Sequence, residues 1–108
     1  MSTIKIETGK PLALSTAVEY ASGSIVSKTL LDKPTGTITL FAFDAGQGLS
    51  EHTSPYDATI QVLDGEGVLT IDGKTIKAGA GELIIMPANV PHDVQAETPF
   101  KMMLIMIR

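Results

Sequence analysis

The sequence predicts an all-β protein that folds as one small sandwich or closed barrel. Short runs rich in β-branched and aromatic residues follow one another along the chain, and turn residues recur about every 8–12 positions. The chain has 108 residues, the usual size of one domain, and contains no linker or internal repeat. These observations favour one β-rich core built from many short strands.

The individual strands follow from the alternation of apolar and polar residues. In 37–43, Ile38, Leu40 and Ala42 share one face, and the threonines and phenylalanines share the other. The dipeptide Asp72-Gly73 predicts a tight hairpin, because both central residues of such a turn need positive φ. Pro87 should end the strand that precedes it. In chain order, the expected strands are 37–43, 59–63, 68–71, 74–77 and 82–86.

Residues 15–22 are the one ambiguous segment. Thr16 and Glu19 have the spacing of a capping box, which would begin a short helix. Gly23 and the β-rich residues after it favour a twisted strand instead. We therefore predict a strand here.

The final run, 102–107, is apolar on both faces of the strand it should form. A strand with one face in water would alternate, so we expect this one to be covered on both sides. The second cover is either another subunit, which predicts a homodimer, or an N-terminal strand folded over it. The two faces carry Met102, Leu104 and Met106 on one side and Met103, Ile105 and Ile107 on the other.

Composition excludes several classes of partner. The net charge of −4, without a cluster of Lys or Arg, argues against binding to nucleic acid or to an anionic membrane. Cysteine is absent, so the sequence offers no disulfide, thiolate metal site or cysteine nucleophile. No secretory signal is recognisable and the apolar runs are too short to span a membrane, so we expect a cytoplasmic protein.

Two stretches carry a family likeness. Residues 46–58, GQGLSEHTSPYDA, lead to Gly65, and residues 81–92, GELIIMPANVPH, follow after a hairpin. Their order and spacing resemble the two motifs of the cupins over about 36–107. Asn89 stands where the family usually has glycine, but asparagine tolerates the left-handed conformation. The resemblance implies a double-stranded β-helix, or jelly-roll barrel, spanning 1–108 as a single domain, with 1–35 supplying leading strands and a cavity inside.

The resemblance also implies a metal site, of which this sequence keeps half. Cupin metal sites use two histidines and a glutamate from the first motif and one histidine from the second. His52 and His92 match two of these ligands, whereas Ser54 and Ala58 replace the other two. Two imidazoles alone bind divalent metal weakly. A third ligand could come from Asp57 if a bulge turned its side chain inward. In that case a divalent Fe, Mn, Ni or Zn ion is the expected cofactor.

The same alignment brings His52, Ser54 and His92 to one cavity as a polar patch. Gln61 is a further candidate oxygen ligand, but its position in the strand does not decide whether its side chain points into the cavity. Met86 is a candidate residue of the cavity wall. Each wall residue can equally be ordinary core. The other wall candidates by strand position are Ile60, Val62, Ile84 and Met106.

Three functions remain open from the sequence. The leading hypothesis is a cupin that binds a small organic molecule in the barrel with a depleted metal site. The first alternative is a metal-dependent enzyme of dioxygenase or isomerase type, and the second is a dimeric interaction module with a vestigial cavity. No Ser-His-Asp arrangement or phosphate loop is recognisable, so the sequence assigns no catalytic residue.

Overall fold

The computed structural model describes residues 2–3 and 8–108, which form ten strands and one short helix. Most of the strands are connected by short turns, as the sequence predicts. The strands are β1 Ser2–Thr3, β2 Ile25–Lys33, β3 Gly36–Phe43, β4 Gly48–His52, β5 Asp57–Asp64, β6 Glu66–Ile71, β7 Lys74–Gly79, β8 Leu83–Met86, β9 His92–Gln95 and β10 Phe100–Ile107; the helix is α1 Leu14–Ala17.

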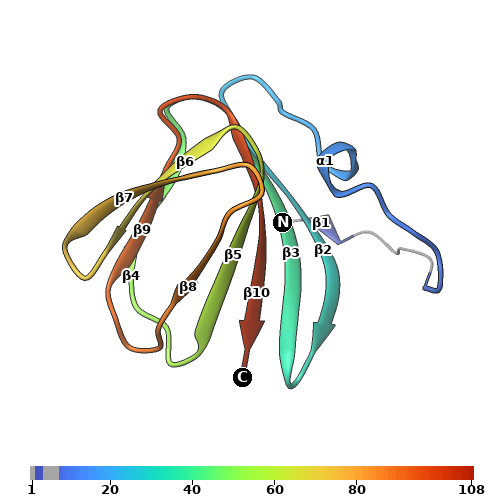
Figure 1. The fold of residues 1–108 in the computed structure, drawn as a ribbon. Helices are drawn as coiled ribbons and strands as arrows, with labels where there is room; N and C mark the ends of the chain where they lie inside the picture. The colour runs from blue at the N-terminus through green and yellow to red at the C-terminus, as the bar shows by residue number, and fades with distance from the viewer. Residues whose placement is uncertain (1, 4–7) are drawn as a thin grey trace.

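The strands form two sheets that face each other across the core (Figure 1). One sheet has the order β1-β2-β3-β10-β5-β8, and the other has the order β4-β9-β6-β7. Most pairings are antiparallel, and β1 pairs with β2 in parallel. The all-β jelly-roll barrel expected from the sequence is confirmed. No helix in the described part of the chain has the length and apolarity to cross a bilayer.

Alternation along the strands decides which side chains fill the barrel. On β5, Ala58, Ile60 and Val62 are buried in the core between the sheets, and the residues between them face the opposite side. The rings of Phe43 and Phe100 stack at a centroid distance of 4.9 Å where the two sheets meet. Both rings are fully buried, so they anchor the closed end of the barrel.

Two turns confirm the conformations predicted from their residues. Asp72 and Gly73 have φ of 50° and 78°, as the tight hairpin between β6 and β7 requires. Asn89 has φ of 63°, so it adopts the left-handed conformation expected of it. Its N–H donates to the carbonyl oxygen of Ser54 at 2.7 Å, which joins the β8–β9 turn to the segment after β4.

The strand predicted over 15–22 is wrong, because the chain forms the short helix α1 one residue earlier and then an extended link. Leu14, Ala17 and Val18 recur at helical spacing and pack on the outer face of the six-stranded sheet, beside Leu40. The alternative helix beginning at Thr16 is also misplaced, since Ala13 is the N-cap residue. Of the leading strands expected in 1–35, the described residues form β1 and β2; residues 1 and 4–7 lie outside the description.

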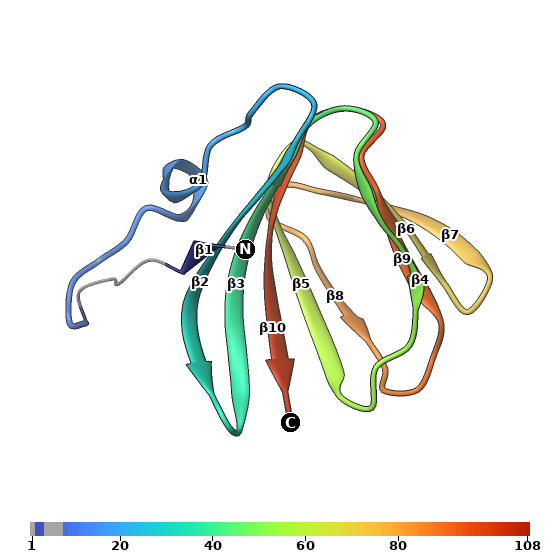
Figure 2. The same ribbon diagram turned by 180° about the vertical axis from the view of Figure 1, so that it is seen from behind.

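The N-terminal segment with α1 lies beside the six-stranded sheet (Figure 2), and two lysines and a tyrosine fasten it there. Lys28 and Lys101 donate to the carbonyl oxygens of Ala17 and Ser15 at 2.7 and 2.6 Å. Tyr20 donates to the Asp64 carboxylate at 2.6 Å. Burial, and then this carboxylate, raise the pKa of the Tyr20 hydroxyl, so it remains a donor across the physiological range.

The N-terminal segment covers only part of the outer face of β10. Met103 packs beneath it, together with Leu40 and Val18. Further along β10, Ile105 is half-buried and Ile107 is 62% exposed. A helix and an extended link therefore supply part of the second cover, in place of the N-terminal strand that was one of the two alternatives.

Gly67 tests how tightly this core is packed. A Cβ added there would lie 2.7 Å from Cε2 of the buried Phe100 ring, which cannot move away without disturbing its stack with Phe43. We expect Gly67→Ala to lower the free energy of unfolding by about 1–3 kcal/mol in urea denaturation. Gly79→Ala on the paired strand is the control, because its Cβ meets nothing closer than 3.7 Å. Equal stabilities of the two variants would contradict this packing.

Candidate functional site

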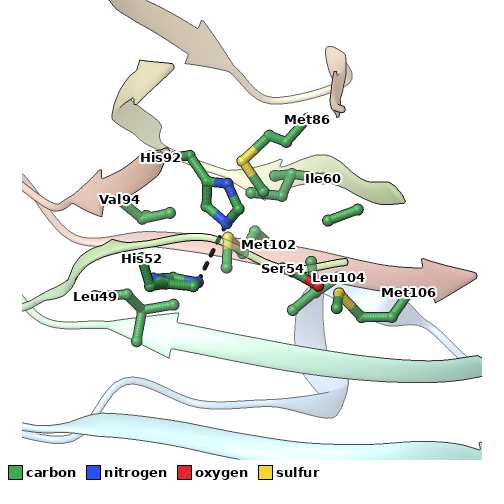
Figure 3. Close-up of a pocket in the computed structure, with 11 residues that line it drawn as sticks. Leu49, His52, Ser54, Ile60, Met86, His92, Val94, Met102, Leu104 and Met106 are labelled. Carbon is green, nitrogen blue, oxygen red and sulfur yellow. Dashed lines mark hydrogen bonds between the residues drawn. The ribbon is translucent and has the colours of Figure 1, made fainter. Parts of the chain in front are cut away.

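A cavity of about 180 Å³ lies between the two sheets, toward the end where the histidines are (Figure 3). Both sheets contribute to it, and its walls are mostly aliphatic side chains and methionines. The polar residues among them are His52, Ser54 and His92. The remaining lining residues are Leu49, Ala58, Ile60, Met86, Val94, Met102, Leu104 and Met106.

The pairing of β4 with β9 sets the two histidines opposite each other. His52 is the register partner of His92, and Leu49 is the partner of Val94. Between these pairs β4 has two residues where β9 has one, so β4 contains a β-bulge. The extra residue lets Leu49 and His52 both face the cavity, which regular alternation would forbid.

The two imidazole rings are in contact. Their Nε2 atoms lie 3.2 Å apart, and the rings meet edge to face with centroids at 4.4 Å (Figure 3). His92 is buried, with 4% of its surface exposed, whereas His52 is exposed at the rim. The pair therefore extends from the buried interior of the cavity to its solvent-exposed rim.

Backbone carbonyls fix the orientation of both rings. Nδ1 of His52 lies 2.7 Å from the carbonyl oxygen of Ser50, and Nδ1 of His92 lies 3.0 Å from that of Val90. A carbonyl oxygen can only accept, so each Nδ1 carries the hydrogen. Each ring is tied to the backbone two residues before it, which turns its Nε2 toward the cavity.

Ser54 follows β4 and also faces the cavity. Its hydroxyl oxygen accepts from the N–H of Tyr56 at 3.1 Å. That bond uses the oxygen as acceptor and leaves the hydroxyl hydrogen able to donate into the cavity. The structure thus brings His52, Ser54 and His92 to one cavity, together with the predicted wall residue Met86.

Two other residues singled out from the sequence lie elsewhere. Gln61 alternates with Ile60 on β5, pairs with Met103 and Leu83, and does not line the cavity. Asp57 is exposed, and its carboxylate accepts from the N–H of Ala88 at 2.9 Å. No bulge turns Asp57 inward, because the register of β5 with β10 is continuous over 57–62.

Sequence reasoning missed half of the cavity walls. Met102 and Leu104 share a face of β10 with Met106, so their alternation was a usable signal. Leu49 and Val94 gave no such signal, because β4 and β9 have only five and four residues and β4 is bulged. Of the other wall candidates, Val62 and Ile84 belong to the core beyond the cavity.

Comparison with known proteins decides the family. The sequence profile of the cupin domain matches residues 39–108. This chain is a cupin. A conserved protein of unknown function from Streptococcus pyogenes is 37% identical at a TM-score of 0.91, over 100% of this chain and 96% of that one. No curated protein matches the sequence.

Two further solved structures resemble this cupin. A Cupin 2 conserved barrel domain protein from Leptotrichia buccalis is 46% identical at a TM-score of 0.85, over 88% of this chain. This cupin covers only 46% of that longer relative. A cupin superfamily protein from Desulfitobacterium hafniense is 26% identical at a TM-score of 0.89, over 99% of this chain and 98% of that one.

The family implies a bound metal ion, but this cupin has too few ligand side chains at the site to hold one. The separation of 3.2 Å between the Nε2 atoms is near that of two nitrogens on one tetrahedral ion, roughly 3.4 Å for bonds of about 2.1 Å. However, protein metal centres need at least a third ligand. Among the described residues no three His, Cys, Asp or Glu side chains converge, and Ala58 lies in the wall where the family has glutamate. The residues present do not form a metal centre.

Metal analysis tests this reading of the donors. The native chain should bind Zn²⁺ or Ni²⁺ weakly in calorimetric titration and retain none after dialysis against EDTA. The double variant Ser54→His/Ala58→Glu is the control, because it restores the two missing family ligands and should retain about one ion per chain. A native chain that keeps stoichiometric metal through dialysis would overturn the reading.

Proposed function

We propose that this cupin binds a small organic molecule inside the barrel, with the polar end of the molecule against His52, Ser54 and His92. The observation that supports this proposal is a cavity with apolar walls and a few convergent polar groups, the usual composition of a ligand site. Without a ligand or water, the histidine pair would face largely apolar surface.

The size of the cavity limits the ligand. Its volume of about 180 Å³ compares with an apolar cavity of about 150 Å³ that accepts benzene. A ligand with one ring, or a short aliphatic chain, fits this space. Met86, Met102 and Met106 lie in the wall, and methionine side chains adapt to irregular ligands.

A metal-dependent enzyme of dioxygenase or isomerase type has less support. That chemistry needs a metal held by three or more ligands, and this cavity offers two imidazoles. Nucleophilic catalysis has no better basis, because the described hydrogen bonds join neither histidine to the Ser54 hydroxyl. The binding function therefore accounts for more of the residues present.

A second candidate function, self-association, rests on the outer face of the six-stranded sheet. One registered row across this face, which we call the outer row, consists of Leu31, Ile38, Ile105, Thr59 and Ile85. Leu31 and Ile85 are 43% and 61% exposed, a concentration of apolar surface that is typical of an interface.

A second copy of the chain suits this face. In the next row, Lys33 and Asp57 stand at opposite ends, with Gly36 and Ile107 between them. A two-fold axis along the strands would set each Lys33 opposite the partner's Asp57. We propose that the outer row forms the centre of a homodimer.

Ligand binding is tested by filling the cavity. Ala58 faces the cavity with 1% exposure, so Ala58→Leu should occupy its space and weaken any fragment found by thermal-shift screening by at least about tenfold. Ala80→Leu, in an exposed turn, is the matched control and should bind as the native chain does. Fragments that bind both variants equally would place the binding site elsewhere.

Dimerisation is tested by light scattering. The native chain should have twice its 11.4 kDa mass, and Ile85→Asp should return it to the monomer mass, because the charge would be buried without a partner. Ile76→Asp is the control, since Ile76 is also exposed but belongs to β7 of the other sheet. A native monomer at high concentration excludes the proposal.

A further inference from the structure

The six-stranded sheet gives the cavity a wall that contains three thioether groups. Met102 and Met106 line the cavity from β10, and Met86 lines it from β8 (Figure 3). The other methionine in the described part of the chain, Met103, packs on the outer face of the same sheet. Met86 and Met102 are almost fully buried, so a contact between either of them and a ligand is shielded from bulk water.

The four-stranded sheet gives the cavity its facing wall, and this wall contains two aromatic rings. His52 on β4 and His92 on β9 meet edge to face, with their ring centroids 4.4 Å apart. Leu49 and Val94 belong to the same wall. A molecule that fills the space between the sheets therefore has thioethers on one side and imidazole rings on the other.

Both kinds of group attract an aromatic ring more strongly than an aliphatic group of the same size. A thioether sulfur makes favourable contacts with the edge of an aromatic ring. A neutral imidazole favours a second ring through edge-to-face or offset stacking, and a charged one favours it through a cation–π contact. The preference for a ring therefore does not depend on the protonation of the histidines. An aliphatic molecule gains only from the burial of its apolar surface.

We infer that the ligand of this cavity contains a single aromatic ring, which lies between the methionines of β8 and β10 and the His52–His92 pair. The inference rests on the proposed binding function and adds the class of ligand, because the cavity volume of about 180 Å³ alone admits a ring or a short aliphatic chain. An oxygen substituent on the ring can accept the hydroxyl hydrogen of Ser54, whose oxygen already accepts from the N–H of Tyr56.

Phenol and cyclohexanol test the inference, because they share a hydroxyl group and nearly the same size but differ in aromaticity. In calorimetric titrations of the full chain, we expect phenol to bind at least about fivefold tighter than cyclohexanol. The triple variant Met86→Leu/Met102→Leu/Met106→Leu should reduce this preference about twofold or more, because leucine keeps the volume and removes the sulfur. Met103→Leu is the matched control and should keep the native preference, because Met103 lies on the other face of β10.

A second measurement needs no substitution in the cavity wall. The ring current of phenol shifts the NMR signals of nuclei close to the ring, whereas cyclohexanol has no ring current. In a chain whose methionine methyl groups carry ¹³C, phenol should move the signals of Met86, Met102 and Met106 further than cyclohexanol does. The Met103 signal is the internal control and should stay in place.

The outcomes separate the aromatic ring from the binding site itself. Cyclohexanol that binds as tightly as phenol, with both weakened by Ala58→Leu, would overturn the inference and leave the cavity as the binding site. A preference for phenol that the triple variant keeps in full, or methionine signals that phenol does not move, would also overturn it. If neither probe binds the native chain, the inference falls. The proposed function falls with it if thermal-shift screening also finds no fragment that Ala58→Leu weakens.

Discussion

The pairing of β4 with β9 is the constraint on which the site depends. Antiparallel register makes His52 the direct neighbour of His92, and a bulge between Leu49 and His52 turns both β4 side chains toward the cavity. Without the bulge, Glu51 would share the inward face with Leu49 and would place a carboxylate in the cavity. One extra residue in a short strand thus decides the charge of the pocket.

The replacement of two family ligands gives the cavity its character. Ala58 has no side chain beyond Cβ, so the wall is open where a glutamate would stand. Ser54 contributes a hydroxyl instead of an imidazole, and its oxygen is already bonded to the backbone. The remaining groups offer hydrogen bonds and apolar surface, which is what the proposed binding of an organic ligand requires. The same two positions explain why metal chemistry has little support.

Most of the barrel could be predicted from the sequence, because alternation and turn chemistry are local. The positive φ values of Asp72 and Asn89 follow from their residue types. The face of the sheet to which each side chain of β3 and β10 points follows from the alternation of residues along the strand. The bulge in β4 depends on pairing with a strand forty residues away, so no local pattern reveals it. The strand predicted for the N-terminal segment is wrong because the helix there has only four residues, too few to give a clear helical pattern. That helix is stabilised by residues distant in sequence, such as Lys101, which donates to the carbonyl oxygen of Ser15.

The proposed binding of a small organic molecule beside the His52–His92 pair is the central claim of this account. Long-range ¹H–¹⁵N correlation spectra of the histidine side chains, recorded with and without a fragment found by thermal-shift screening, test it most directly. The account predicts that the Nε2 resonances of both rings shift when the fragment binds, because both rings line the cavity. Nε2 resonances that do not respond to a bound fragment would contradict it.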